Sequence, residues 1–293
     1  MHADQCEITV DTVSRLIASQ FPRWSGLPIQ PVRSYGTVNA LFRLGEDIVL
    51  RLPLRPRRDI RDELRRQHAM VERIAARVPV PVPEPLAIGE PGSGYDGVWA
   101  AYRWIPGETA SEHAIGDADR FAEDLAGFVT ALHTLDTGGG TWNGKTRGGP
   151  LHTRDSDVRR RLAECANLVD TVRLTQVWER CLRADIPATR HVWLHADLLP
   201  GNLLVRDGRL AAVIDLETAC IGDPAVDLMP AWNLLPPGAR DTYRRALGVN
   251  DATWERGRGW ALSQAIVALP YYLHTNPVMV ATARRTLAAV LED

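Results

Sequence analysis

The sequence is poor in several features that mark particular classes of protein. It has one lysine, Lys145, among 34 basic residues, and its net charge of −2 gives no case for a nucleic-acid partner. Its four cysteines lack the spacing of a metal site, which indicates reduced thiols (Cys6, Cys165, Cys181 and Cys220). No apolar run is long enough to span a membrane, and the N-terminus lacks the order of a signal peptide. We therefore expect a cytoplasmic protein that has no nucleic acid or membrane as a partner.

The composition is that of an ordinary globular protein. Hydrophobic residues make up 45% of the 293 residues and charged residues make up 24%. A chain of this length can bury a sizeable core, either as one large domain or as two lobes. The part after Trp104 has more acidic than basic residues, which would suit a cationic substrate.

One stretch, residues 191–228, contains the residues that most clearly indicate a chemical function. It reads HVWLHADLLPGNLLVRDGRLAAVIDLETACIGDPAVDL. Within it, the dipeptide Asp207-Gly208 stands between two apolar runs and predicts a tight β-hairpin. We expect residues 203–206 and 210–214 to pair as antiparallel strands across this turn.

The predicted hairpin brings together two side chains that carry oxygen. Asn202 precedes its first strand and Asp215 follows its second strand, so the two would lie side by side. Because Mg²⁺ prefers oxygen ligands, an amide oxygen and a carboxylate facing a common point predict a magnesium site. Asp197 lies on the same loop as Asn202 and is available to contact a substrate hydroxyl.

These residues carry a resemblance to a known family. The sequence HADLLPGNLLV followed by VIDLETACIGDPAVDL resembles the aminoglycoside phosphotransferase family of protein-kinase-like small-molecule kinases. Asp197 and Asn202 match the Asp-x-x-x-x-Asn pattern of the catalytic loop, and Asp215 matches its metal-binding Asp. The resemblance extends from about Ser34 to the last helix. Where the family usually has His-Gly-Asp, this chain has Ala196 in place of the glycine.

The resemblance implies an α+β, protein-kinase-like fold with two lobes. The first lobe, residues 1–104, would bind the nucleotide with a small antiparallel sheet and one long helix. The second lobe, residues 105–293, would be mainly helical and hold the catalytic loop, the metal site and the acceptor pocket. The implied enzyme uses Mg²⁺ and moves the γ-phosphoryl group of ATP or GTP to a hydroxyl of a small molecule. Aminoglycosides and other antibiotics are such acceptors, which would connect the chain with antibiotic resistance.

The resemblance also implies roles for single residues. Asp197 would be catalytic, orienting the acceptor hydroxyl and taking its proton, while Asn202 and Asp215 would hold magnesium. Arg51, in the run IVLRLP, stands where the family has a lysine that pairs with phosphate. Because a guanidinium can also grip phosphate, Arg51 would supply this cation. A strand-face arginine in a surface ion pair is the alternative.

Four further parts of the first lobe are implied to contact the nucleotide or Arg51. Glu63 is the carboxylate that the family pairs with the strand cation, and Glu72 of the same predicted helix is its competitor. The segment around Ser34, Thr37 and Asn39 takes the place of a glycine-rich loop, although an ordinary hairpin loop fits it as well. Main-chain groups from Arg103 to Ile105 would hold the purine edge at the hinge between the lobes.

Hydrophobic periodicity predicts the remaining elements. In the first lobe we expect helices at 10–21 and 59–78 and strands at 29–34, 40–44, 48–52, 86–89 and 98–104. In the second lobe we expect helices at 119–135, 158–169, 172–182, 225–235, 237–247, 251–272 with a break at Pro270, and 277–291, besides a short strand at 192–194.

Four polar residues of the catalytic stretch each allow a structural and a functional interpretation. Asp223 followed by Pro224 predicts a helix N-cap, with a metal contact as the minority interpretation. Asp227 would brace the catalytic loop. His195 is interpreted as a residue that fixes the loop rather than as a general base. Glu217 would approach the metal or a cationic substrate, or hold a structural place.

Two other hypotheses compete with the kinase. Residues 139–146 match the phosphate-binding pattern G-x-x-x-x-G-K-T, with Lys145 as its lysine. A helix is predicted before this segment, and the following Arg-Gly-Gly-Pro cannot start a helix promptly, so a linker is the better account. The second rival is a nucleotide-binding pseudokinase that acts as a scaffold, supported by the absent lysine at Arg51 and by the single glycine in residues 34–39.

Overall fold

The structure is a computed structural model that describes residues 6–33, 38–111, 113–184 and 190–292. The chain divides into two compact units, one made of Met1–Ala76 and Pro81–Pro106 and the other of Arg77–Val80 and Gly107–Asp293. The roles expected of the two lobes stay predictions at this point. Across the described ranges, no helix has the length and apolar character needed to cross a membrane.

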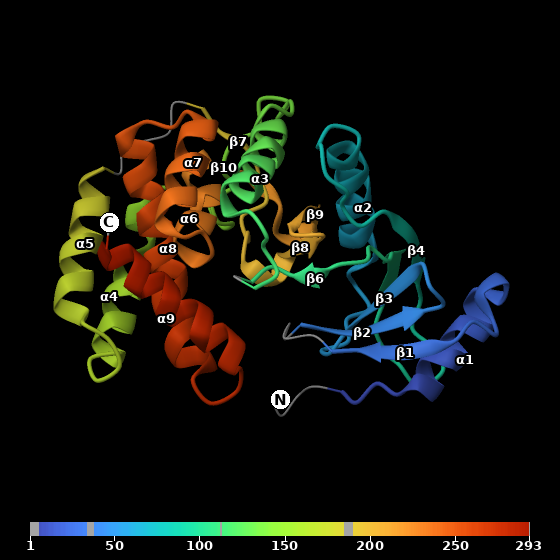
Figure 1. Cartoon of the computed structure of the whole chain (residues 1–293). Helices are drawn as coiled ribbons and strands as arrows, with labels where there is room; N and C mark the ends of the chain where they lie inside the picture. The colour runs from blue at the N-terminus through green and yellow to red at the C-terminus, as the bar shows by residue number, and fades with distance from the viewer. Residues whose placement is uncertain (1–5, 34–37, 112, 185–189, 293) are drawn as a thin grey trace. The chain divides into compact units, whose positions relative to one another are not determined.

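The first unit is built on a five-stranded antiparallel sheet (Figure 1). Its strands lie in the order β1-β2-β3-β5-β4. All five strands were predicted from the sequence within a few residues. They are β1 (Ile29–Val32), β2 (Asn39–Leu44), β3 (Ile48–Pro53), β4 (Pro85–Gly89) and β5 (Trp99–Arg103).

The two faces of this sheet bury different helices. Leu50 and Leu52 of β3 point to one face and pack with Leu16 of α1 (Val10–Gln20). The alternate residues point to the other face, where Leu64 of α2 (Arg61–Ala75) packs in a smaller cluster with Tyr102 of β5. Side chains alternate along a strand, so this arrangement places Arg51 on the α2 face.

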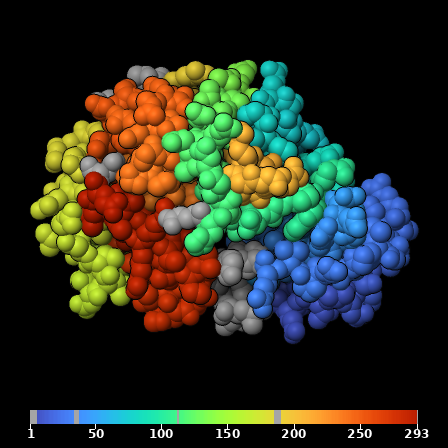
Figure 2. All heavy atoms as spheres, viewed as in Figure 1, coloured from blue at the N-terminus to red at the C-terminus, as the bar shows by residue number. Residues whose placement is uncertain are grey.

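The second unit is mainly helical. The helix α8 lies at its centre and contacts α4, α5, α6 and α9, and Figure 2 shows atoms of α5 (yellow) and α9 (red) on the surface of this unit. The predicted α+β fold, with a small antiparallel sheet and a helical second part, is confirmed. The helices are α3 (Ala118–His133), α4 (Asp155–Glu164), α5 (Thr171–Arg183), α6 (Pro230–Asn233), α7 (Pro237–Leu247), α8 (Asp251–Tyr272) and α9 (Pro277–Glu292).

Two helix predictions were wrong in detail, and proline explains both. The expected break at Pro270 is absent, because α8 continues through this residue to Tyr272. So close to the helix end, the missing N–H costs one hydrogen bond and does not interrupt the helix. The predicted helix 225–235 is instead a 3₁₀ helix, Pro224–Leu228, followed by α6, because Pro230 favours the first position of a new helix.

The predicted hairpin is present in the second unit. β8 (Leu203–Arg206) pairs antiparallel with β9 (Arg209–Val213). At the turn Asp207 and Gly208 both have positive φ, of 54° and 75°, as a two-residue hairpin turn requires. The sequence did not reveal β6 (Glu108–Thr109), which pairs with β8, or β10 (Cys220–Gly222), which pairs with β7 (Val192–Leu194). β6 has only two residues, both exposed, and β10 ends in a glycine, so neither shows the apolar run that identified the equally short β7.

Candidate active site

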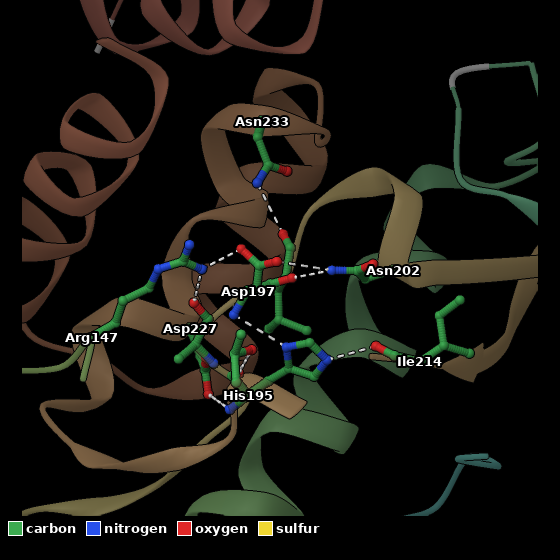
Figure 3. A network of polar contacts seen from close by, with 10 residues as sticks. Arg147, His195, Asp197, Asn202, Ile214, Asp227 and Asn233 are labelled. Carbon is green, nitrogen blue, oxygen red and sulfur yellow. Dashed lines mark hydrogen bonds and ion pairs between the residues drawn. The ribbon is translucent and has the colours of Figure 1, made fainter. Parts of the chain in front are cut away.

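Asp197 lies in the loop that follows β7, and its side chain is held from two directions (Figure 3). Nδ2 of Asn202 donates to Oδ2 of Asp197 at 3.2 Å and to its carbonyl oxygen at 2.8 Å. On the other side, the guanidinium of Arg147 pairs with Oδ1. The Asp197 side chain is 15% exposed, so the carboxylate is fixed and still accessible to a ligand.

A buried carboxylate fixes the backbone of this loop. Oδ2 of Asp227 accepts from the amide of His195 at 3.0 Å, and Oδ1 accepts from the amide of Ala196 at 2.9 Å. His133 adds a third contact, with its Nε2 3.1 Å from Oδ2. Asp227 is fully buried, so these hydrogen bonds form away from water and are correspondingly strong. The bracing role expected for Asp227 agrees with this geometry.

His195 uses both ring nitrogens on the backbone. Nε2 donates to the carbonyl of Ile214 at 2.9 Å, and Nδ1 accepts from the amide of Asp197 at 3.2 Å. Since the carbonyl can only accept, the proton resides on Nε2. The ring therefore connects the loop to the end of β9 and has no free nitrogen for general-base chemistry.

The hairpin places Asn202 and Asp215 next to each other. The amide of Ile214 donates to the carbonyl of Asn202 at 2.9 Å, directly before Asp215. Asp215 has left-handed backbone angles, φ 65° and ψ 52°, which turn the chain at this point. Because Nδ2 of Asn202 is used by Asp197, its Oδ1 is the atom available as a ligand.

One amide oxygen and one carboxylate form a donor set that fits Mg²⁺, which commonly takes few protein ligands and completes its shell with water and phosphate. The described part of the chain has no group of three or more His, Cys, Asp or Glu side chains that could hold a metal ion. The assignment of both residues as magnesium ligands stays a prediction.

Ala196 occupies the position where the family usually has glycine. Its φ is 64°, in the left-handed region that residues with a Cβ rarely adopt. The strain costs about 1 kcal/mol or more. The hydrogen bond from its amide to buried Asp227 offsets this cost and holds the residue in place.

The nucleotide-contacting residues predicted in the first unit are less tightly held. Arg51 lies in mid-strand opposite Leu41 and Ala100, with its guanidinium 5.8 Å from the ring centre of Tyr102. Glu63 is 49% exposed and pairs with Arg57 at 3.7 Å. The expected pairing of Glu63 with Arg51, and the competing role of Glu72, stay predictions.

The other nucleotide contacts expected here are placed as follows. Asn39 begins β2, opposite Pro53. Arg103 ends β5, and its side chain pairs with Glu84 at 2.7 Å, while Ile105 follows the strand. Ser34 and Thr37 lie outside the described residues. The structure therefore leaves the predicted nucleotide contacts of the first unit as a hypothesis.

The family model described as "Phosphotransferase enzyme family" matches residues 30–260. The chain belongs to this phosphotransferase family. The predicted enzyme class is thereby confirmed, and the catalytic stretch lies wholly within the matched residues. No curated protein matches the chain.

Solved structures support the fold. The GDP and kanamycin complex of APH(2")-IIia is similar, with a TM-score of 0.72 and 20% identity over 95% of this chain and 97% of the other. Macrolide 2'-phosphotransferase MphH from Brachybacterium faecium has a TM-score of 0.62 and 23% identity over 96% and 97%. The streptomycin-ATP-APH(2")-IIa complex has a TM-score of 0.60 and 14% identity over 97% and 99%.

The rival phosphate-binding loop at Lys145 is not formed in this phosphotransferase. Oδ1 of Asn143 accepts from the amides of Lys145 and Thr146, both at 2.9 Å, so these amides are already used within the loop. The segment follows α3 and leads to a 3₁₀ helix, Leu151–Arg154. A phosphate-binding loop needs a strand before it and a helix after it, with amides directed at the phosphates.

Asp223 is a cap, as the sequence predicted. Its Oδ1 accepts from the amide of Ala225 at 3.0 Å. Both carboxylate oxygens also accept from Arg256, at 2.6 and 3.2 Å, in a pair whose side chains are each 6% exposed. These contacts engage the whole carboxylate and leave no oxygen for a metal.

Two polar residues near Asp197 were missed by sequence reasoning. Arg147 contacts its carboxylate, and Asn233 donates from Nδ2 to the carbonyl of Leu198 at 3.0 Å. Arg147 directly follows the phosphate-loop pattern of residues 139–146, and this pattern predicts a role for Lys145 but none for Arg147. Asn233 lies in an apolar stretch, and a single asparagine among apolar residues does not form a recognisable motif.

Proposed function

We propose that this phosphotransferase moves the γ-phosphoryl group of ATP or GTP to a hydroxyl group of a small molecule. The single observation that carries the proposal is the fixed yet accessible carboxylate of Asp197 beside Asn202. A carboxylate in this position can accept a hydrogen bond from an acceptor hydroxyl and then take its proton. The acceptor oxygen forms the new bond to the γ-phosphorus while the bond to the leaving nucleoside diphosphate breaks.

Asn202, through Oδ1, and Asp215 would hold magnesium in this reaction. The ion held there would supply positive charge that neutralises the phosphate groups. The protein contributes mainly by position, because phosphoryl transfer passes through a loose transition state with little covalent chemistry for side chains. His195 and Asp227 serve this purpose by fixing the loop that carries Asp197.

The nucleotide would contact residues of the first unit. Arg51 would supply the cation for its phosphates, fixed by Glu63, and the main chain from 103 to 105 would hold the purine edge. Asn39 would meet phosphate oxygens together with Ser34 and Thr37. In support, similar structures contain GDP or ATP, as their names state.

The acceptor would be a hydroxylated small molecule such as an antibiotic. The similar structures are named for complexes with kanamycin and streptomycin and for a macrolide 2'-phosphotransferase. These names state which antibiotics are bound in two of those structures and which class of antibiotic the third enzyme is named for, and they support the class of acceptor proposed here, together with a role in antibiotic resistance.

The substitution Asp197→Asn tests the proposal. We expect it to lower phosphoryl transfer by at least about 1000-fold, since it removes the group that takes the proton and weakens acceptor positioning. Nucleotide affinity should change by less than about threefold. Transfer would be followed in an acceptor panel with labelled ATP and GTP, and Asp241→Asn, on the exposed face of α7, serves as the control. Full turnover by Asp197→Asn would refute the proposal.

A nucleotide-binding scaffold is the second candidate, because Arg51 stands in place of the expected lysine. It predicts that the wild-type protein binds nucleotide with no magnesium-dependent transfer to any acceptor. A third candidate, an NTPase that uses Lys145, predicts that Lys145→Ala is inactive and Asp197→Asn is active. The same assay separates all three.

A further inference from the structure

Arg147 places a positive charge directly on the proposed catalytic carboxylate. Its Nη1 pairs with Oδ1 of Asp197 and donates to the carbonyl of Ala196 at 2.8 Å (Figure 3). Its side chain is 37% exposed, so the Arg147 side chain that contacts Asp197 is partly open to solvent.

The backbone around Arg147 is anchored. The thiol of Cys220 donates to the Arg147 carbonyl at 3.2 Å, and burial raises the pKa of this thiol to about 11, so it keeps its proton. The next residue, Gly148, accepts from the amide of Asp223 at 2.8 Å. A Cβ on Gly148 would lie 2.7 Å from Leu194, so only glycine fits this packed position. Arg147 is thus presented by a fixed segment.

The guanidinium is also held by α8. With its amide oriented so that the oxygen faces Arg147, Gln264 accepts from Nε at 3.2 Å and from Nη1 at 3.0 Å. This orientation satisfies both partners, which the opposite one does not. Asp197, Arg147 and Gln264 therefore form one connected set of polar contacts between the catalytic loop and α8.

The face of α8 that continues from Gln264 is apolar. Val267, Ala268 and Tyr271 follow at i+3, i+4 and i+7, and these positions lie on one side of a helix. The first two are half-buried, and Tyr271 is 51% exposed. No Asp or Glu occurs in residues 256–291, which cover the rest of α8 and nearly all of α9. Beyond Glu255, α8 therefore supplies no carboxylate of its own that would pair with a cationic ligand.

We propose that Arg147 is the resident counter-ion of Asp197 and makes the site select acceptors without a positive charge beside the reacting hydroxyl. An ammonium group there would lie close to the guanidinium, where like charges repel. A neutral acceptor with an apolar side would instead meet the α8 face. This inference rests on the proposed function and narrows its acceptor class. It differs from the expectation, drawn from the acidic balance of the second part, that a cationic substrate would suit the chain, and the experiment below decides between the two.

Matched pairs of acceptors test the inference. Each pair consists of an amino sugar derivative with a free amine next to a hydroxyl and its N-acetylated form, which differ in charge at that position. The kcat/KM ratio of neutral to cationic acceptor would be measured for the wild type, Arg147→Gln and Arg147→Lys. Arg120→Gln, which alters an arginine with a 66% exposed side chain on α3, is the control.

We expect the wild type to prefer the neutral acceptor by at least about tenfold, the difference that a nearby like charge produces. Arg147→Gln should reduce this ratio by about the same factor. Arg147→Lys should keep it, because the charge remains, and Arg120→Gln should not change it. An unchanged ratio in an active, folded Arg147→Gln variant would overturn the inference.

Binding of the same pairs, measured by calorimetry without turnover, separates this inference from the proposed function. Absence of transfer to every acceptor would reject the kinase. Tighter binding of the neutral members, lost in Arg147→Gln, would still support the role of Arg147. Equal binding of both members of each pair, including no binding of either, overturns it.

Discussion

The loop around Asp197 and the strand around Arg51 differ in how their functional groups are held. In the loop, the bracing side chains His195 and Asp227 are completely buried and bonded to the backbone. On the first unit, Glu63 is half exposed and pairs with Arg57 of the neighbouring segment. Burial fixes the first set of groups, whereas solvent screens the pair of Glu63 with Arg57.

The difference shows where a sequence motif determines geometry. When a buried hydrogen bond is lost, a polar group stays in the interior without a partner, and the protein loses the full free energy of removing that group from water. Other arrangements of the catalytic loop are therefore much less stable than the observed one. An exposed ion pair contributes little and can exchange partners. Roles inferred from motif positions should hold better in the loop than on the strand, and four experiments test this comparison.

Asp227→Ala should have the largest effect on stability. It would remove the acceptor for the amides of His195 and Ala196 and leave both donors unsatisfied in the interior. We expect a loss of about 3–5 kcal/mol in the free energy of unfolding. Denaturant unfolding of the second unit would measure it, with Asp241→Ala on the exposed side of α7 as a control that should stay within about 0.5 kcal/mol of the wild type. A loss below about 1 kcal/mol would mean that burial does not fix this loop.

Asp215→Asn should have the largest effect on the metal requirement. If Asp215 holds magnesium, loss of its charge should lower kcat/KM by about 100-fold and raise the magnesium concentration needed for half-maximal activity. Asp207→Asn removes a carboxylate from the turn of the same hairpin, where asparagine tolerates the positive φ, and should leave both values unchanged. An unaltered magnesium dependence in Asp215→Asn would remove it from the ligand set.

Arg51 is the test in the first unit. Arg51→Ala should raise the KM for nucleotide by about tenfold and leave the KM for the acceptor unchanged, because only the phosphate cation is lost. Arg51→Lys, which restores the residue usual in the family, should recover most of the loss. Glu63→Gln and Glu72→Gln, compared in the same assay, identify the carboxylate that positions Arg51. Equal nucleotide affinity in Arg51→Ala and the wild type would favour a surface role.

Local patterns accounted for most of the fold. The Asp207-Gly208 turn located the hairpin, and alternating or helical apolar spacing located the five strands of the sheet and the long helices. Short elements such as β6 and β10 escaped because their pairing depends on tertiary contacts rather than on their own residues. The end of α8 was misjudged because proline disrupts a helix less near its end.

The candidate site was only partly predictable, because some of its contacts also depend on tertiary packing. Asp197, Asn202 and Asp215 lie in one stretch, so local spacing and the hairpin sufficed to associate them. Arg147 reaches Asp197 from 50 residues away. Its position depends on the packing of Gly148 against β7 and β10, which no local pattern encodes.

Of the four substitutions, Cys220→Ser should have the smallest effect, and this effect is on the free energy of unfolding. The substitution tests whether the segment behind the catalytic loop is buried. Burial raises the pKa of the Cys220 thiol from 9.0 to about 11, so the folded protein keeps the neutral form while the unfolded chain ionises above pH 9. The resulting stability is fully present below pH 9 and is lost as the pH rises from about 9 to about 11. We expect this loss to be roughly 1–2 kcal/mol in the wild type.

Serine keeps a donor for the Arg147 carbonyl and does not titrate in this range. The free energy of unfolding of Cys220→Ser should therefore fall less steeply than that of the wild type between pH 9 and 11, whatever its value at neutral pH. Other groups titrate equally in both proteins, so the difference between the two curves isolates the thiol. Parallel curves would show that this part of the second unit is open to water, and the contrast between the buried catalytic loop and the half-exposed Glu63–Arg57 pair of the first unit would lose one of its supports.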